Sequence, residues 1–209
     1  MNLYICPSCG AEVIFKSRFT SYTVCSFCQS LLMRSDDQLH FDGTMALLPS
    51  DMSVVQIGTK GTFLQTPFEV IGRLKVAWNE GSWNEWLTLE ETGAQGWLAE
   101  AMGFYIYTHE ISFPKDFPNL KELDIGSEIM LQNLTFKVSD IKEVVCAGGE
   151  GELPFQVLEG LEGLSIDLRT ASEDFSCIEV FNGSGRIFIG RYVDFDDLNL
   201  SNLRVIDGW

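Results

Sequence analysis

Two stretches of the chain, IGTKGTFLQTPFEVIGRLKV at residues 57–76 and IGSEIMLQNLTFKVSDIKEV at residues 125–144, share one apolar pattern at an offset of 68 residues. Identical residues meet at five positions, for example Phe68 with Phe136. Apolar and polar residues alternate in the first stretch, which is the period of a β-strand with one buried face. Two copies are too few for a solenoid. We therefore expect two similar small antiparallel β-units of SH3-like type, in which each unit, or the pair together, closes its own core as a barrel or sandwich.

Strand and turn signals continue outward from the first copy. Residues 67–78 alternate between apolar and polar, NEGS at residues 79–82 turns the chain, and WNEWLTLEE at residues 83–91 is typical of a second strand. Long helical periods are absent, so the sequence predicts a mainly β protein. The first β-unit is expected over residues 54–112 and the second over residues 113–209.

Cysteine spacing predicts a metal site near the start of the chain. The motifs CPSC and CSFC place two Cys-x-x-Cys pairs fifteen residues apart. Two such pairs, joined by a short hairpin, supply the tetrahedral set of four sulfurs that zinc prefers. Residues 1–34 are therefore predicted to form a zinc ribbon, with a linker over residues 35–53. The predicted ligands are Cys6, Cys9, Cys25 and Cys28.

Disulfide bonds and redox chemistry are the alternatives for these cysteines. The start MNLYICPSCG lacks the pattern of a secretory leader, so we expect the reducing cytoplasm, which disfavours disulfides. A thioredoxin-like pair would need a βαβ setting that the sequence does not predict. Because sulfur fills all four coordination positions, the zinc is expected to be structural. Its removal should melt residues 1–34 and leave the rest folded, since so short a module lacks a sufficient core.

The charge of the chain limits its partners. The formal net charge is −16, and all but one of the thirty acidic residues lie beyond residue 35. Such a surface repels nucleic acid and anionic lipid, which bind clusters of Lys and Arg. No run of eighteen apolar residues occurs, so no membrane span is expected. The acidic excess fits either simple solubility or a basic protein partner, and the sequence gives no indication of oligomeric state.

Tryptophans gather in the first β-unit. Trp78, Trp83, Trp86 and Trp97 lie within twenty residues. In a regular strand Trp86 faces away from Leu87, so both are buried only if both faces of the sheet are covered. The aromatic residues either fill the core of a small barrel or form a groove for a peptide or ligand. The candidate partner-binding residues are Trp83, Asn84, Glu85, Trp86, Trp97 and Glu100.

The same region carries a family resemblance. The pattern F-x-V-x-G-x-L, followed by G-S-W-N-E-W and G-W-L-A-E-A-M-G-F, is matched by Phe68, Val70, Gly72, Leu74, Gly81, Trp83, Asn84, Glu85, Trp86, Gly96, Trp97, Leu98, Glu100 and Gly103. It resembles the bacterial family called domain of unknown function 4178 (DUF4178). Residues 151–155 resemble the family's G-E-L-P-W stretch, with Phe155 where Trp is usual. The resemblance implies a β-rich cytoplasmic bacterial protein, sometimes preceded by a zinc ribbon and sometimes linked to membrane-stress proteins, and it implies no particular activity.

Catalytic groups are scarce in the sequence. His40 and His109 have no evident partner, and Cys146 and Cys177 lie in apolar strand-like runs where a thiol usually packs as a small hydrophobe. We therefore expect a non-catalytic adaptor or accessory protein that binds a protein partner in a bacterial, membrane-stress-linked system. The first alternative is a small-molecule sensor or enzyme with a pocket between the two β-units. The second is nucleic-acid binding through the ribbon, whose Lys16 and Arg18 lie among aromatic residues.

Overall fold

The computed structural model describes residues 2–35, 38–45, 48, 51–172 and 174–206. Strands form nearly all of its regular structure, which confirms the mainly β prediction. Among the described residues, no helix has the length and apolar character needed to span a bilayer. The elements are β1 (Asn2–Ile5), β2 (Glu12–Phe15), β3 (Tyr22–Val24), β4 (Ser30–Ser35), β5 (Gln38–Thr44), β6 (Lys60–Phe63), β7 (Thr66–Trp78), β8 (Gly81–Glu90), β9 (Gln95–Ala101), β10 (Phe104–Ile111), η1 (Leu120–Glu122), β11 (Glu128–Leu131), β12 (Leu134–Leu153), β13 (Glu162–Arg169), β14 (Asp174–Phe181), β15 (Ser184–Val193) and η2 (Asp196–Leu198).

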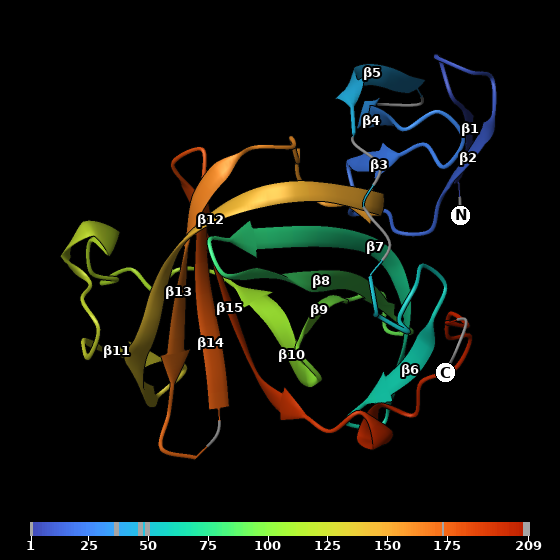
Figure 1. The fold of residues 1–209 in the computed structure, drawn as a ribbon. Coiled ribbons are helices and arrows are strands. Elements are labelled where there is room, and N and C mark those ends of the chain that lie inside the picture. The colour runs from blue at the N-terminus through green and yellow to red at the C-terminus, as the bar shows by residue number, and fades with distance from the viewer. Residues whose placement is uncertain (1, 36–37, 46–47, 49–50, 173, 207–209) are drawn as a thin grey trace.

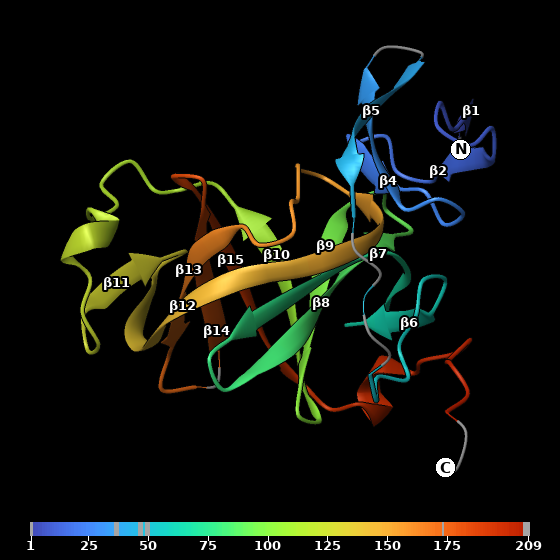
Figure 2. The same cartoon turned by 45° about the horizontal axis from the view of Figure 1, so that its top comes forward.

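Eight strands close into an antiparallel barrel (Figures 1 and 2). Their order around the ring is β7, β8, β9, β10, β15, β14, β13 and β12, and β12 then pairs with β7. Closure pairs each of these strands on both sides, which removes the free edges that would otherwise recruit other chains. At the β7–β12 seam the backbones approach closely, because a Cβ on Gly72 would lie 1.8 Å from the Glu152 carbonyl oxygen.

The 68-residue repeat corresponds to two matched hairpins. β6 and β7 are joined at Leu64 and Gln65, β11 and β12 at Gln132 and Asn133, and all four residues have positive φ. Each hairpin is followed by three more strands, and the two halves meet along the β7–β12 and β10–β15 pairs. The strands of both segments therefore share one continuous sheet, and the finer prediction of two SH3-like units is not confirmed.

Apolar residues cover both faces of the barrel wall. Leu87 belongs to the cluster inside the barrel, where it packs with residues such as Leu74 and Phe188. Its neighbour Trp86 lies in a second cluster on the outer face, together with Tyr107 and with Leu198 of η2. A third cluster, which includes Ile129 and Phe136, covers the outer face of the second half. Trp86 and Leu87 are thus both buried, because each face has its own cover.

The cysteine-rich end joins the barrel through β12. Residues Tyr22–Val24 of β3 pair with Gly151–Leu153, and β4 and β5 extend the sheet beyond β3, whereas β1 and β2 form a sheet of their own (Figure 1). The Glu152 carboxylate accepts hydrogen bonds from the Lys16 amide (2.5 Å), the Ser17 amide (3.1 Å) and the Thr20 hydroxyl (2.6 Å). β5 lies within residues 35–53, so the predicted linker contains a strand that pairs with β4.

Candidate metal centre and buried polar sites

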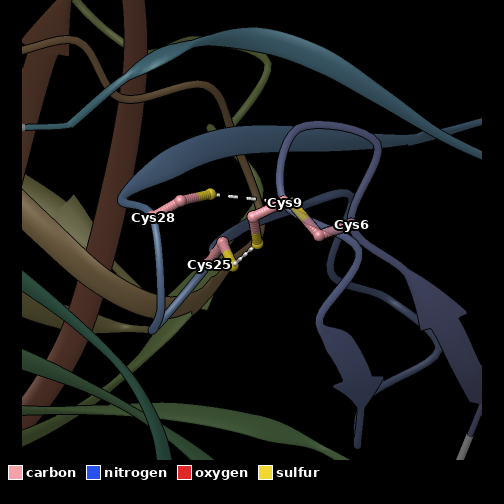
Figure 3. A group of neighbouring side chains, drawn as sticks. All are labelled: Cys6, Cys9, Cys25 and Cys28. Carbon is pink, nitrogen blue, oxygen red and sulfur yellow. Dashed lines mark hydrogen bonds between the residues drawn. The ribbon is translucent and has the colours of Figure 1, made fainter.

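Four cysteine side chains converge between two turns of the N-terminal region (Figure 3). In the first turn the Gly10 amide donates to the Cys6 carbonyl, and in the second the Gln29 amide donates to the Cys25 carbonyl, both at 2.9 Å. Gly10 and Gln29 have positive φ, which lets each turn reverse direction directly after its second cysteine. The structure therefore brings together the four residues that the spacing selected, all with sulfurs within 4.8 Å of one another: Cys6, Cys9, Cys25 and Cys28.

The sulfur distances fit a tetrahedral metal ion. The sulfurs of Cys6 and Cys28 lie 3.7 Å apart, and those of Cys9 and Cys25 lie 3.8 Å apart. Sulfur ligands about 2.3 Å from zinc would be separated by about 3.8 Å along each edge of the tetrahedron. A disulfide would need a separation of about 2.05 Å, and all four cysteines are free. The cluster can therefore hold a metal ion with sulfur alone.

The residues of the tryptophan motif divide between the two faces of the barrel wall. Alternation along β8 places Trp83 and Glu85 toward the interior, and Asn84 and Trp86 on the outer face. On β9, Trp97 packs inside and Glu100 lies outside. All six are buried except Trp83, which is partly exposed. The motif thus contributes to two separate buried sites, and its proposed contact with a partner stays a prediction.

The outer site is a polar network around Glu100. Its carboxylate accepts hydrogen bonds from the Ser53 hydroxyl (2.5 Å), the Asn84 amide (3.2 Å), the Trp86 indole (3.0 Å) and the Tyr105 hydroxyl (3.3 Å). Burial, with the neighbouring carboxylate of Glu100, raises the pKa of Tyr105 to about 12. These four hydrogen bonds satisfy the buried Glu100 carboxylate, which therefore needs neither a metal ion nor a basic side chain as a partner.

Asp51 lies at the edge of this outer network and connects it to three basic side chains. Its carboxylate accepts from Lys75 Nζ at 2.6 Å and from Arg204 Nη2 at 2.9 Å, and it also pairs with Arg73. Although burial opposes ionisation, hydrogen bonds from Lys75 and the charge of Arg73 hold the pKa of Asp51 well below its usual range. Asp51 is therefore ionised at neutral pH.

The inner site surrounds Glu85 inside the barrel. The Trp83 indole donates to the Glu85 carboxyl at 2.7 Å, and burial together with the nearby Glu179 raises the pKa of Glu85. Arg186 donates to Glu179 at 2.8 Å, and its guanidinium lies 3.5 Å from the centroid of the Phe155 ring. The interior therefore holds one ion pair, Arg186–Glu179, beside the Glu85 carboxyl group, whose raised pKa favours its protonated form.

A cavity of about 340 Å³ lies beside the inner site. Glu110, Phe113 and Arg186 contribute to its wall. Burial raises the pKa of Glu110, while the charge of Arg186 acts in the opposite direction. Among the described residues, Nη1 of Arg186 is the one buried side-chain nitrogen or oxygen without a hydrogen-bond partner. The opening beside the inner site thus contains this cavity and one hydrogen-bond donor without a partner, Nη1 of Arg186.

The remaining titratable candidates have ordinary structural surroundings. Burial raises the pKa of Cys146 to about 11 and also raises that of Cys177, so both thiols are poor nucleophiles at neutral pH. His109 Nε2 lies 2.6 Å from Glu90, which also accepts from the Tyr107 hydroxyl at 3.3 Å. His40 lies on β5. These contacts are compatible with packing and surface pairing.

Sequence reasoning missed the bases and acids that complete both sites. Arg73 and Lys75 alternate along one strand, which is a detectable signal, but Asp51 and Arg204 are separated by 153 residues and meet only in the fold. Arg186 and its partner Glu179 lie directly opposite each other on β15 and β14, and that register was not evident from the sequence.

Together these features define a class of protein, a closed antiparallel β-barrel that carries a four-cysteine ribbon. The family model described as Domain of unknown function (DUF4178) matches residues 56–195, and the chain belongs to this family. The matched region begins just before β6 and extends past the end of β15, so it covers the barrel and leaves the cysteine ribbon outside. No curated protein and no solved structure matches the chain.

Proposed function

We propose that this protein is a non-catalytic accessory protein that binds a protein partner through its zinc ribbon. The observation that carries the proposal is an exposed apolar face on the β1–β2 sheet. Leu3 and Ile14 are directly opposite each other in the pairing, and Leu3, Ile5 and Ile14 are 58%, 58% and 51% exposed. Their strand neighbours Val13 and Phe15 are buried on the other face. Large aliphatic side chains gathered on one exposed face are typical of a protein-binding surface.

In this proposal a zinc ion has a structural role. Sulfur fills all four coordination positions, which leaves none for water or substrate. The apolar cluster beneath the exposed face is small, so the metal would supply most of the stability of the ribbon; its buried members are Cys6, Val13, Phe15, Cys25 and Leu32. Zinc would thereby hold the apolar face in a fixed shape.

A pull-down with matched variants tests the partner-binding proposal. The test variant is Leu3→Thr/Ile14→Thr, which places a β-branched residue that favours strands at both positions. The control is Leu64→Asn/Met102→Asn, at two exposed apolar positions on barrel turns where Asn tolerates the positive φ. We expect one bacterial protein to be retained by the wild type and the control and lost from the ribbon variant. Equal retention by both variants, or no retained protein, would contradict the proposal.

The bases of the ribbon do not support an extension to nucleic acid. Lys16 Nζ lies 2.5 Å from Glu69, and the Arg34 guanidinium lies over the Phe15 ring while it donates to the Ser17 and Arg18 carbonyls. These side chains are engaged within the chain. The bacterial, cytoplasmic and membrane-stress setting of the proposal rests on the family alone.

Small-molecule binding in the open pocket of about 340 Å³ at the mouth of the barrel is a second candidate, favoured by the unused Arg186 donor beside it. The test is native mass spectrometry of freshly purified wild type and of Arg186→Met. A metabolite bound to the wild type and absent from the variant would support this function, whereas two spectra without any bound metabolite would contradict it.

A further inference from the structure

The Asp51 carboxylate occupies a cluster of donors on the outer face of β7 and β8. Besides Arg73, it accepts from Lys75 Nζ at 2.6 Å, Asn84 Nδ2 at 3.3 Å and Arg204 Nη2 at 2.9 Å. Three of these four donors are cationic. Charge-assisted hydrogen bonds of this kind are the usual means of recognising a carboxylate.

The receiving side of this cluster is built into the barrel wall. Arg73 is 4% exposed and Lys75 is 9% exposed, and both lie on β7. The Arg73 guanidinium is held by Asn84 Oδ1, at 3.1 Å from Nε and 2.7 Å from Nη2, and it lies 4.8 Å from the Trp86 ring centroid. These contacts fix the Arg73 guanidinium in place independently of Asp51.

The carboxylate, in contrast, comes from a connecting segment. Residues 51–59 contain no strand or helix, and Asp51 is held mainly by the side chains that it contacts. Ser53 anchors the same segment through its bond to Glu100, and Arg204 donates to the Ser53 carbonyl at 2.9 Å. The acceptor Asp51 thus lies on the connecting segment of residues 51–59, which we call the strap, whereas Arg73 and Lys75 lie on strand β7.

A cavity of about 410 Å³ lies next to the cluster. Its wall includes Arg73, Trp86, Glu150 and Arg204, together with Val55 and Ile57 of the strap. Glu150 Oε2 lies 3.7 Å from Arg73 Nη1 and is 39% exposed. The carboxylates of Glu150 and Glu100 disfavour a multiply charged anion such as phosphate, whereas a monocarboxylate carries the same charge as Asp51. The aliphatic part of a ligand would contact Trp86 and Val55.

We propose that this cluster is a binding site for the carboxylate of a small organic acid, which Asp51 of the strap occupies when no ligand is bound. Replacement of Asp51 by the ligand leaves the charge of the site unchanged, because one carboxylate replaces another beside Arg73, Lys75 and Arg204. Loss of Asp51 alone would leave Arg73 and Lys75 buried with an incomplete set of counter-charges, which strongly favours uptake of an external carboxylate.

Chemical rescue of Asp51→Ala tests the site. We expect the variant to unfold at a lower temperature than the wild type, and formate or acetate to restore its stability. At a ligand concentration ten times the dissociation constant, the shift in Tm should be about 3 °C or more. Chloride and phosphate at equal ionic strength should give no comparable rescue. Asp124→Ala, at an exposed aspartate, is the matched control and should show no preference for carboxylates.

A second measurement follows the strap in the wild type. Hydrogen exchange of residues 51–55 should become at least twofold faster at acetate concentrations well above those that saturate Asp51→Ala, because the ligand must compete with the tethered Asp51 carboxylate. If Asp51→Ala folds only in acetate buffer, that result supports the site, and failure to fold in any buffer contradicts it. Absence of carboxylate-specific rescue, or unchanged exchange of the strap, would show that Asp51 serves only as a structural clamp.

Discussion

Truncation of Trp86 to alanine should destabilise the barrel strongly. The side chain is 1% exposed, packs in the outer cluster with Val70 and Leu98, and donates its indole N–H to Glu100 at 3.0 Å. Removal of a buried tryptophan costs about 3–5 kcal/mol. Loss of a hydrogen bond to a charged group costs about 1.5–3 kcal/mol, although the two effects are not fully additive. We expect a total loss of about 4 kcal/mol in the free energy of unfolding.

Urea denaturation followed by far-UV circular dichroism measures this loss. With a slope of about 2 kcal/mol per molar urea, the midpoint should fall by about 2 M. Trp86→Phe keeps most of the packing and should lose only about 1–3 kcal/mol. Phe27→Ala, at an aromatic residue that is 75% exposed, is the control and should change stability by less than about 0.5 kcal/mol. A midpoint for Trp86→Ala equal to that of the control would refute the assignment of Trp86 to the core.

Three further predictions concern the ribbon and the barrel interior. Chelation of the metal that we propose for the ribbon should abolish hydrogen-exchange protection in residues 1–34 while β13–β15 stay protected, because the ribbon's own apolar cluster is small and β13–β15 pack in a separate cluster; simultaneous loss in both regions would contradict the proposal. Glu152→Ala removes the acceptor for Lys16, Ser17 and Thr20, so exchange of residues 12–24 should accelerate with a loss of about 2–3 kcal/mol, and unchanged exchange would argue against the junction. Because the pKa of Glu85 in the folded protein is raised above its usual 4.5, the contribution of Glu85 to stability falls as pH rises above that value, whereas Glu85→Gln has no proton to lose. The Tm of Glu85→Gln relative to the wild type should therefore increase from pH 4.5 upward, and a Tm difference independent of pH would contradict the raised pKa.

Much of the fold was predictable because it depends on local patterns. The 68-residue repeat predicted two similar β-units, and in the structure the shared apolar pattern gives the same local pairing in β6–β7 and β11–β12. The cysteine spacing predicted the four-sulfur cluster for the same reason. Strand alternation indicated that Trp86 and Leu87 could both be buried only with cover on each face, and the two clusters supply that cover.

Closure of the barrel was not predictable from these patterns. The β7–β12 and β10–β15 pairs join strands that are distant in sequence. The alternation of apolar and polar residues within each half is equally consistent with a half that closes on itself. Residues 35–53 gave no clear period, yet β5 forms there because β4 offers it an edge. The Asp51 and Arg204 contact likewise depends on where two irregular segments cross the outer face, which no local signal specifies.

The central claim is that four sulfurs hold one structural zinc ion, which shapes the apolar face of the ribbon. Native mass spectrometry of protein purified without chelators tests it most directly, in parallel with Cys25→Ser/Cys28→Ser. We expect one zinc ion for each wild-type chain, none in the variant, and four reduced cysteines at positions 6, 9, 25 and 28. A wild-type mass without metal, two hydrogens lighter for each disulfide formed, would contradict the claim.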